Sequence, residues 1–188
     1  MISEKEAIGL LKKHIPDAKI QAIVIEHSKL VQEIALDIAK DIPDADIEFI
    51  RIASLLHDIG RMGCPPKTDK AILHGVKGAA LLREEGRIQT CEEEFEAYAK
   101  VAERHLGAGL SKEAIEEQNL PLPKQDFIPE TVEEKIITAA DNLVEHIDGQ
   151  YVEISIEKSV DRFTKEVNPE VGQKIKDLYD EVMDMKTT

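Results

Sequence analysis

The segment Ala53-Ser54-Leu55-Leu56-His57-Asp58-Ile59-Gly60-Arg61 sets the architecture expected of this chain. An apolar run ends here in a histidine and an adjacent carboxylate, and the glycine that follows is of the kind that closes a helix C-terminus. The pair His57-Asp58 therefore places two metal-ligand side chains at the edge of a packed helical interior. Taken alone, this dipeptide proves little.

The length of 188 residues is typical of one domain. We expect a single domain over residues 1–188, with a metal-binding core at about 24–147 and C-terminal helices at 153–185 packing on it. Two cysteines form no disulfide framework, and no leader-like pattern opens the chain, so a cytoplasmic location is expected. No stretch has the ~20 apolar residues that a membrane helix needs.

The charge balance bears on partners. Asp and Glu number 38 against 24 Lys and Arg, a formal net charge of -14. This charge opposes attraction to a nucleic-acid polymer or an anionic membrane. A small phosphorylated substrate remains compatible, because bound divalent metals reverse the local field.

Apolar residues recur at helical spacing along most of the chain, which predicts an all-α fold. Period-2 alternation is confined to residues 151–156. The expected helices lie near residues 3–14, 23–41, 46–57, 72–85, 91–105, 112–118, 131–147, 153–166 and 169–185. Helix starts are indicated by capping boxes at Ser3/Glu6, Thr90/Glu93 and Thr131/Glu134 and by Asn168-Pro169. The segments 60–70 and 119–129, rich in glycine or proline, are expected to be loops.

Four histidines and two aspartates fall at inward or helix-end positions of these helices. His27 shares a stripe with core residues of its helix, and His105 extends another stripe in the same way. A single inward histidine is usually a core residue bonded to a carbonyl. Six such groups need buried partners at once, and one shared metal cluster satisfies them together. The set is His27, His57, Asp58, His74, His105 and Asp141.

This ordered set resembles the HD-domain superfamily of metal-dependent phosphohydrolases, over roughly residues 26–145. The resemblance implies an all-α helical bundle of about eight or nine helices. It also implies a first metal held by His27, His57, Asp58 and Asp141, as in the family. His74 and His105 are the positions that hold a second metal in the dinuclear, HDIG-type branches, with Asp58 bridging.

Residues 74–81 and 135–141 look most like the small bacterial HD enzymes that split dinucleoside tetraphosphates, although the sequence after Asp141 departs from them. Residues 57–65 look like the opening of the cyclic-di-GMP phosphodiesterase signature, with Arg61 where that branch has lysine. Residues 103–110 lack that branch's second adjacent histidine and its Gly-Tyr-Pro element. No acidic pair follows His57-Asp58, which disfavours the alarmone hydrolases and the single-metal 5′-deoxynucleotidases.

The resemblance implies a phosphohydrolase that cleaves a small phosphoester or phosphoanhydride, with a nucleotide as the expected substrate, through a metal-bridged hydroxide. The candidate catalytic residues are Asp58 and Arg61, and the candidate substrate-binding residues are Arg61 and Lys77. Both cations have an alternative interpretation as solvated surface charges. The expected cofactors are two divalent ions, iron or manganese first, with magnesium, nickel or zinc as alternatives.

Other functions stay open at this stage. A mixed-valent di-iron HD-type oxygenase uses the same ligand set, and oxygen uptake would separate it from a hydrolase. A nucleotide-sensing module without catalysis would be expected to carry degraded ligands, and none of the six positions is degraded. We expect no nucleic-acid polymer and no membrane as partner, and a homodimer is left open. His14 and His146 are interpreted as surface or helix-end residues, and Cys64 as a small buried hydrophobe.

Overall fold

The computed structural model describes residues 1–66 and 68–187, and in this part of the chain it is mostly helical, as expected. Lys67, within the predicted loop 60–70, and Thr188 lie outside the described residues. The elements are α1 (Glu4–His14), α2 (Ala18–Ala39), α3 (Ile47–Leu56), the 3-10 turns η1 (Ile59–Arg61) and η2 (Ala71–Leu73), α4 (His74–Gln89), α5 (Glu92–Arg104), α6 (Lys112–Glu117), α7 (Val132–Asn142), strands β1 (Val144–Ile147) and β2 (Gln150–Glu153), α8 (Ile156–Glu166) and α9 (Pro169–Asp184).

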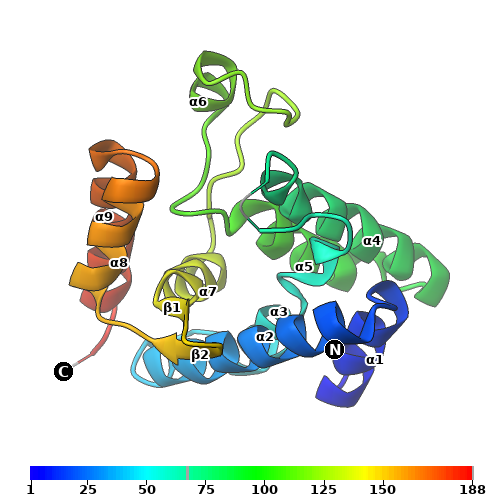
Figure 1. Ribbon diagram of the computed structural model, residues 1–188. Helices are drawn as coiled ribbons and strands as arrows, with labels where there is room; N and C mark the ends of the chain where they lie inside the picture. Colours follow the sequence, from blue (N-terminus) through cyan, green and yellow to red (C-terminus); the bar gives the residue numbers. More distant parts are fainter. Residues whose placement is uncertain (67, 188) are drawn as a thin grey trace.

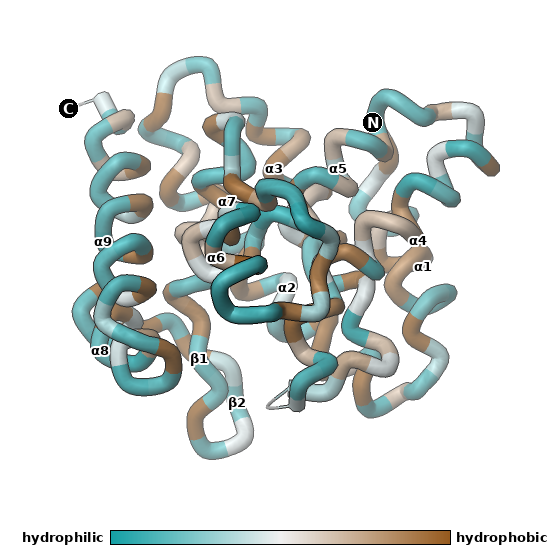
Figure 2. Tube along the Cα trace, turned by 90° about the horizontal axis from the view of Figure 1, so that it is seen from above, coloured by the Kyte–Doolittle hydropathy of each residue, from teal (hydrophilic) through white to brown (hydrophobic). Residues whose placement is uncertain are grey.

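The long helix α2 runs along the bottom of the bundle in Figure 1, with α7 and the pair α4 and α5 above it. Helices α3 and α7 pack against α2, α4 and α5 form an antiparallel pair on one side, and α9 packs against α7 on the other. Figure 2 shows α8 and α9 at one side of the molecule and α1 and α4 at the opposite side. The core between them is made of fully buried side chains such as Val31, Ile50, Leu56 and Ile136. Among the described residues, no helix is long and apolar enough to cross a membrane.

The predicted helix starts are mostly confirmed by the caps. Ser3 and Glu6 form a reciprocal capping box, and Thr131 and Asn168 each accept a hydrogen bond from the third residue of the helix that follows. The capping box predicted at Thr90 is wrong. Thr90 adopts the left-handed conformation (φ 56°) at the C-terminal end of α4, and Cys91 is the residue that precedes α5. Thr90 in this conformation ends α4, so it cannot also be the residue that caps the start of α5.

Helix α2 begins five residues before the predicted start at 23, because Asp17 caps it. The Asp17 carboxylate accepts hydrogen bonds from the backbone N–H groups of Lys19 and Ile20, at 2.9 and 3.0 Å. The cap residue had a local signal, since it follows Pro16 and is of a type favoured at helix N-termini. The earlier start adds Ile20 to the helix and places Ile20 and Ile23 within its first two turns.

The predicted helix 131–147 is wrong in its last turn, because α7 ends at Asn142 and a β-hairpin follows. The ladder pairs Val144 with Glu153 and His146 with Tyr151. Asp148 and Gly149 form the two-residue turn with φ values of 51° and 86°, the positive values that a hairpin turn of this length favours. The dipeptide Asp148-Gly149, between short segments that contain Val144, Ile147 and Val152, was therefore the local signal for this hairpin.

The segment between α5 and α7 leaves the bundle and returns, with α6 at its far end (Figure 1). It has a small core of its own, formed by Ile115, Leu122 and Phe127. That core packs on Ile72 and Leu73, next to the start of α4. The predicted loop 119–129 is irregular, apart from a single bridge between Leu110 and Phe127.

Candidate metal centre and adjoining cavity

All six predicted ligand side chains come together in the middle of the bundle. His27 lies on α2 and Asp141 on α7, whereas His57 and His105 cap the C-terminal ends of α3 and α5, and His74 opens α4. Three overlapping groups have ligand atoms within 4.8 Å of one another: His27, His57 and Asp58; Asp58, His74 and His105; and His57, His105 and Asp141.

One part of this cluster gathers around His27. Its Nε2 atom lies 2.9 Å from Oδ1 of Asp141, 3.3 Å from Nε2 of His57 and 3.5 Å from Oδ2 of Asp58. Nε2 of His57 lies 3.6 Å from the same Asp141 oxygen. Two imidazoles and two carboxylates thus point at one small volume.

The other part uses the second oxygen of the same aspartate. Oδ1 of Asp58 lies 3.1 Å from Nε2 of His74 and 3.5 Å from Nε2 of His105, and these two nitrogens are 2.9 Å apart. Asp58 thus directs Oδ2 at the first part and Oδ1 at the second. This is the arrangement that a bridging carboxylate requires.

The ring orientations test whether a cation fits. The Nδ1 atoms of His57, His74 and His105 lie 2.7, 2.5 and 2.8 Å from the backbone carbonyls of Ser54, Ala71 and Ala102. A carbonyl only accepts, so each Nδ1 carries a proton, and in the neutral tautomer of such a ring the Nε2 lone pair points into the cluster.

Unprotonated nitrogens that face each other cannot hydrogen-bond, yet Nε2 of His74 and His105 are 2.9 Å apart. Oδ1 of Asp58 is also buried without a hydrogen-bond partner among the described residues. A cation between these lone pairs would satisfy all of them, and a carbonyl on the outer nitrogen is the usual support of a metal-binding histidine. The residues present therefore fit a metal site.

Close backbone packing holds the two halves together. A Cβ on Gly60, in η1, would lie 2.0 Å from the carbonyl oxygen of His74 and 2.4 Å from the backbone nitrogen of Gly78. Only a residue without a side chain permits this approach of η1 to α4. The approach is what brings His74 to Asp58.

The electrostatics favour the protonation states that metal binding needs at Asp58, Asp141 and His105, whereas at His57 burial is outweighed by Asp58 and Asp141, which raise its pKa. Burial alone would raise the pKa of Asp58, but Arg61 and the surrounding histidines hold it well below its usual range. Burial would also raise the pKa of Asp141, but its contacts with His27 and His57 outweigh this effect and hold the pKa well below its usual range. Burial lowers the pKa of His105 to about 4. At neutral pH the cluster therefore offers ionised carboxylates and a neutral imidazole at His105.

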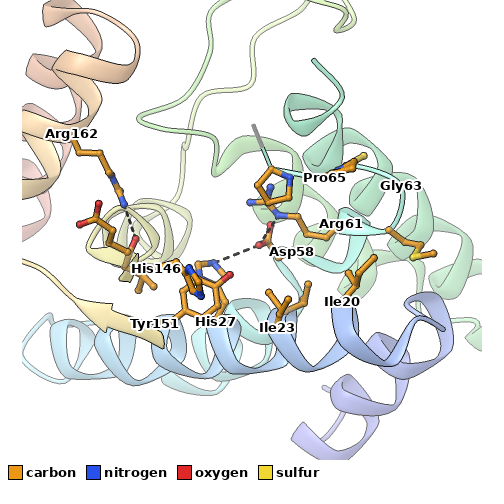
Figure 3. Close-up of a pocket in the computed structure, with 16 residues that line it drawn as sticks. Ile20, Ile23, His27, Asp58, Arg61, Gly63, Pro65, His146, Tyr151 and Arg162 are labelled. Atoms are coloured by element: carbon orange, nitrogen blue, oxygen red, sulfur yellow. Dashed lines mark hydrogen bonds and ion pairs between the residues drawn. The ribbon is translucent and has the colours of Figure 1, made fainter. Parts of the chain in front are cut away.

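A cavity of about 510 Å³ opens beside the cluster (Figure 3). His27, Asp58 and Arg61 lie on its polar side. The Nε–H of Arg61 donates to Oδ2 of Asp58 at 2.9 Å, so the guanidinium is anchored next to the cluster. Lys77, by contrast, lies exposed on α4 and is not among the lining residues, which favours its interpretation as a solvated charge.

The other predicted residues occupy ordinary positions. Cys64 is fully buried and lines the cavity, and His146 is exposed on β1. His14 ends α1, where its Nε2 lies 2.7 Å from a buried Glu85 oxygen.

Several cavity residues were missed from the sequence. They are Ile20 and Ile23 on α2, Met62, Pro65 and Pro66 after η1, and Tyr151 on β2. Tyr151 packs its ring against His27, with 5.0 Å between ring centroids. Burial raises its pKa, so the phenol is protonated at neutral pH. The Asp-Gly turn signal predicts the hairpin that carries Tyr151, but no local pattern shows that this hairpin folds back over α2.

Comparison with known proteins gives a family match over the same residues. The HD domain family model matches residues 24–145. Uncharacterized protein MJ0778 of Methanocaldococcus jannaschii is 44% identical over 126 residues, which is 64% of this chain and 66% of that protein.

Two further relatives are named tRNA (cytidine(56)-2′-O)-methyltransferase. The protein of Picrophilus torridus is 33% identical over 184 residues, 93% of this chain and 48% of its own length. The protein of Thermoplasma volcanium is 34% identical over 157 residues, 83% of this chain and 40% of its own length. This chain therefore spans less than half of either methyltransferase.

Among solved structures, the HD domain of the L. monocytogenes phosphodiesterase PgpH has a similar fold. Its TM-score is 0.51 at 18% sequence identity, and the match covers 95% of both chains. The same domain in complex with cyclic-di-AMP gives the same TM-score and identity, and the match covers 94% of that chain. At this identity the likeness concerns the fold.

Proposed function

The chain belongs to the HD-domain family, and we propose that it is a metal-dependent phosphohydrolase acting on a small phosphoester or phosphoanhydride of the nucleotide class. One observation carries the proposal. The cluster of four histidines and two aspartates adjoins a cavity of about 510 Å³ and contributes His27 and Asp58 to its lining, and this volume lies within the range of about 300–1,000 Å³ usual for small-molecule sites.

We assign His27, His57, Asp58 and Asp141 to a first ion and His74 and His105, with Asp58 shared, to a second. Divalent ions at such a site polarise a phosphoryl group and lower the pKa of a water molecule. Iron or manganese suits this mixture of imidazole and carboxylate. Support comes from the unprotonated nitrogens that face each other and from the two directions in which the Asp58 oxygens point.

Arg61 is the residue of this chain best placed to bind the phosphoryl group. Its Nε–H donates to Asp58, and among the described residues no hydrogen bond occupies the two terminal nitrogens of the guanidinium, which can donate to phosphoryl oxygens. Asp58 in turn restricts the rotamers of Arg61, so less side-chain entropy is lost when substrate binds. A donor held in place before the reaction is what stabilises charge that develops during it.

The comparisons are compatible with this proposal. The PgpH domain is named a phosphodiesterase and holds a cyclic dinucleotide in one structure. Methyl transfer is not proposed, because this chain spans less than half of each methyltransferase relative and its buried polar groups converge on the histidine and aspartate cluster. We further propose that residues 1–188 form one domain, with α9 docked on α7.

The test is hydrolysis by the metal-loaded protein of mononucleotides, dinucleoside polyphosphates and a model phosphodiester. Arg61→Ala should lower kcat/KM by about one to three orders of magnitude at unchanged metal content, because one charge-stabilising donor is lost. Arg87→Ala is the matched control, since this arginine pairs with Glu84 on the exposed face of α4 and lies outside the cavity lining. If no phosphoester is cleaved, the proposal is wrong, and oxygen uptake with an organic substrate would establish the oxygenase alternative.

A further inference from the structure

The cavity has two chemically different sides. His27, Asp58 and Arg61 form the polar side, whereas Ile20, Ile23, Met62 and Pro65 contribute apolar surface. Figure 3 shows Ile20 and Ile23 on the same helix as His27. Ile23 is 48% exposed and Met62 is 39% exposed. Large apolar side chains that stay in contact with water at the mouth of a cavity are typical of a surface that a ligand covers.

Tyr151 adds an aromatic ring to this apolar surface. It faces His146 across the hairpin, with ring centroids 5.0 Å apart, and it packs against the ligand candidate His27 at the same centroid distance. The ring is partly exposed and lines the cavity. An aromatic ring therefore lies directly next to the candidate metal ligand His27 (Figure 3).

The hairpin that carries Tyr151 is anchored at its base. Arg162 donates to the carbonyl oxygens of Val144 and Asn142 at 3.0 and 3.1 Å, and the Ser159 hydroxyl donates to the same Asn142 oxygen at 2.6 Å. The N–H of Ile154 bonds the carbonyl of Leu143 at 2.8 Å. These bonds tie both ends of the hairpin to α7 and α8. The aromatic surface is therefore held in place before any ligand arrives, which lowers the entropic cost of binding.

The position of the apolar surface identifies what it can bind. A phosphoryl group held by Arg61 beside the cluster leaves the rest of the molecule to extend along Ile20, Ile23 and Tyr151. A sugar alone would bind poorly to this apolar surface, because its hydroxyl groups would lose their hydrogen bonds to water without finding enough polar partners. A flat heterocycle gains from both the aliphatic and the aromatic surface, since stacking on an aromatic side chain needs no particular base.

We propose that Tyr151, Ile20, Ile23 and Met62 form a subsite for the heterocyclic base of a nucleoside phosphate whose phosphoryl group lies at Arg61. This inference deepens the proposed function and rests on it for the position of the phosphoryl group. Recognition of the base comes from stacking and apolar contact, so adenine and other bases bind with similar strength. A phosphate ester without a base binds more weakly.

The test compares two ligands that cannot be hydrolysed. They are the methylenephosphonate analogues of adenosine 5′-monophosphate and of ribose 5-phosphate, titrated calorimetrically into the metal-loaded protein. The wild type should bind the adenosine analogue about tenfold or more tightly, the effect expected from one stacked base. Tyr151→Leu should remove most of this preference, whereas Tyr151→Phe should keep it because the ring remains.

Ile23→Asn should reduce the preference about three- to tenfold without unfolding the protein, since this side chain is already half exposed. Ile88→Asn is the matched control: this isoleucine is 61% exposed on α4, outside the cavity, and its loss should leave the preference unchanged. If thermal melting shows that Tyr151→Leu does not fold, the affinities of Ile23→Asn for the two analogues still test the base subsite.

The outcomes for the subsite and for the proposed function are separable. Equal affinity of the wild type for the two analogues, or a full preference retained in both Tyr151→Leu and Ile23→Asn, overturns the subsite, even where phosphoesters are hydrolysed. A preference that depends on Tyr151 and Ile23 supports the subsite, even where no phosphoester is cleaved. In that second case it is the hydrolase proposal that fails.

Discussion

Replacing Gly60 by alanine tests the packing that brings the two halves of the metal centre together. The added Cβ would lie 2.0 Å from the His74 carbonyl oxygen and 2.4 Å from the Gly78 nitrogen, where ordinary contact begins at 3.4 Å. Neither neighbour is the end of a flexible side chain, so η1 and α4 must separate by more than about 1 Å. His74 opens α4 and would move away from Asp58 with it.

Two magnitudes follow from this displacement. Overpacking of this kind costs about 1–3 kcal/mol, which for a chain of this length lowers Tm by roughly 2–12 °C. Metal ligands tolerate deviations of only about 0.2 Å, so a shift of about 1 Å should remove His74 from the second ion. The contacts among His27, His57 and Asp141 lie on α2, α3 and α7 and should persist. Gly60→Ala should therefore retain one ion per chain where, on the proposed assignment, the wild type holds two.

The assay combines elemental analysis of metal-replete protein with calorimetric melting of metal-free protein. Gly9→Ala is the matched control, because a Cβ at Gly9 meets nothing within 4 Å. There the same substitution should raise stability by up to about 1 kcal/mol, as expected for glycine to alanine inside a helix. An unchanged Tm together with full metal content in Gly60→Ala would show that the close packing of η1 on α4 does not position His74.

The remaining predictions concern the candidate ligands and one buried carboxylate, Glu85. His74→Ala and His105→Ala should each deplete the second ion by elemental analysis and keep the first; either variant unfolding at full metal occupancy would indicate a purely structural histidine. Asp58→Ala should lose both ions and all hydrolysis, because its two oxygens face both halves of the centre, and near-normal metal content would disprove the bridge. Glu85, 2% exposed, has a lowered pKa because Lys13 and His14 outweigh its burial. Its stabilisation is therefore complete above pH ~4.5 and lost as the pH falls through the lowered pKa. Glu85→Gln should cost about 1–3 kcal/mol at pH 7 in denaturant titrations, and an equal deficit at pH 3 would contradict this reasoning.

Helical class and the candidate ligand residues were accessible from the sequence, because both depend on short-range patterns. Apolar residues at helical spacing show which face of each helix is buried, and a histidine on that face is conspicuous wherever the fold places it. This is why His27 and Asp141, far apart along the chain, could be assigned to one centre before any distance was known. The family match over residues 24–145 rests on the same ordered residues.

Tertiary contacts decided the rest. Residues 143–147 continue a helical pattern, but hydrogen bonds from Ser159, Arg162 and Ile154 satisfy the carbonyls at the end of α7 and allow the hairpin to form instead. Lys77, like Arg61, is a cation that follows a candidate metal ligand closely in the sequence. Of these two residues, only Arg61 lines the cavity. The orientation of His57, His74 and His105 depends on a carbonyl three residues earlier in each case, and the distance from His74 to Asp58 depends on Gly60 packing against α4. Local sequence determines which side chains lie on the buried face of each helix. Which of these side chains contact one another depends on how closely the helices pack, and this packing depends on residues that are distant in the chain.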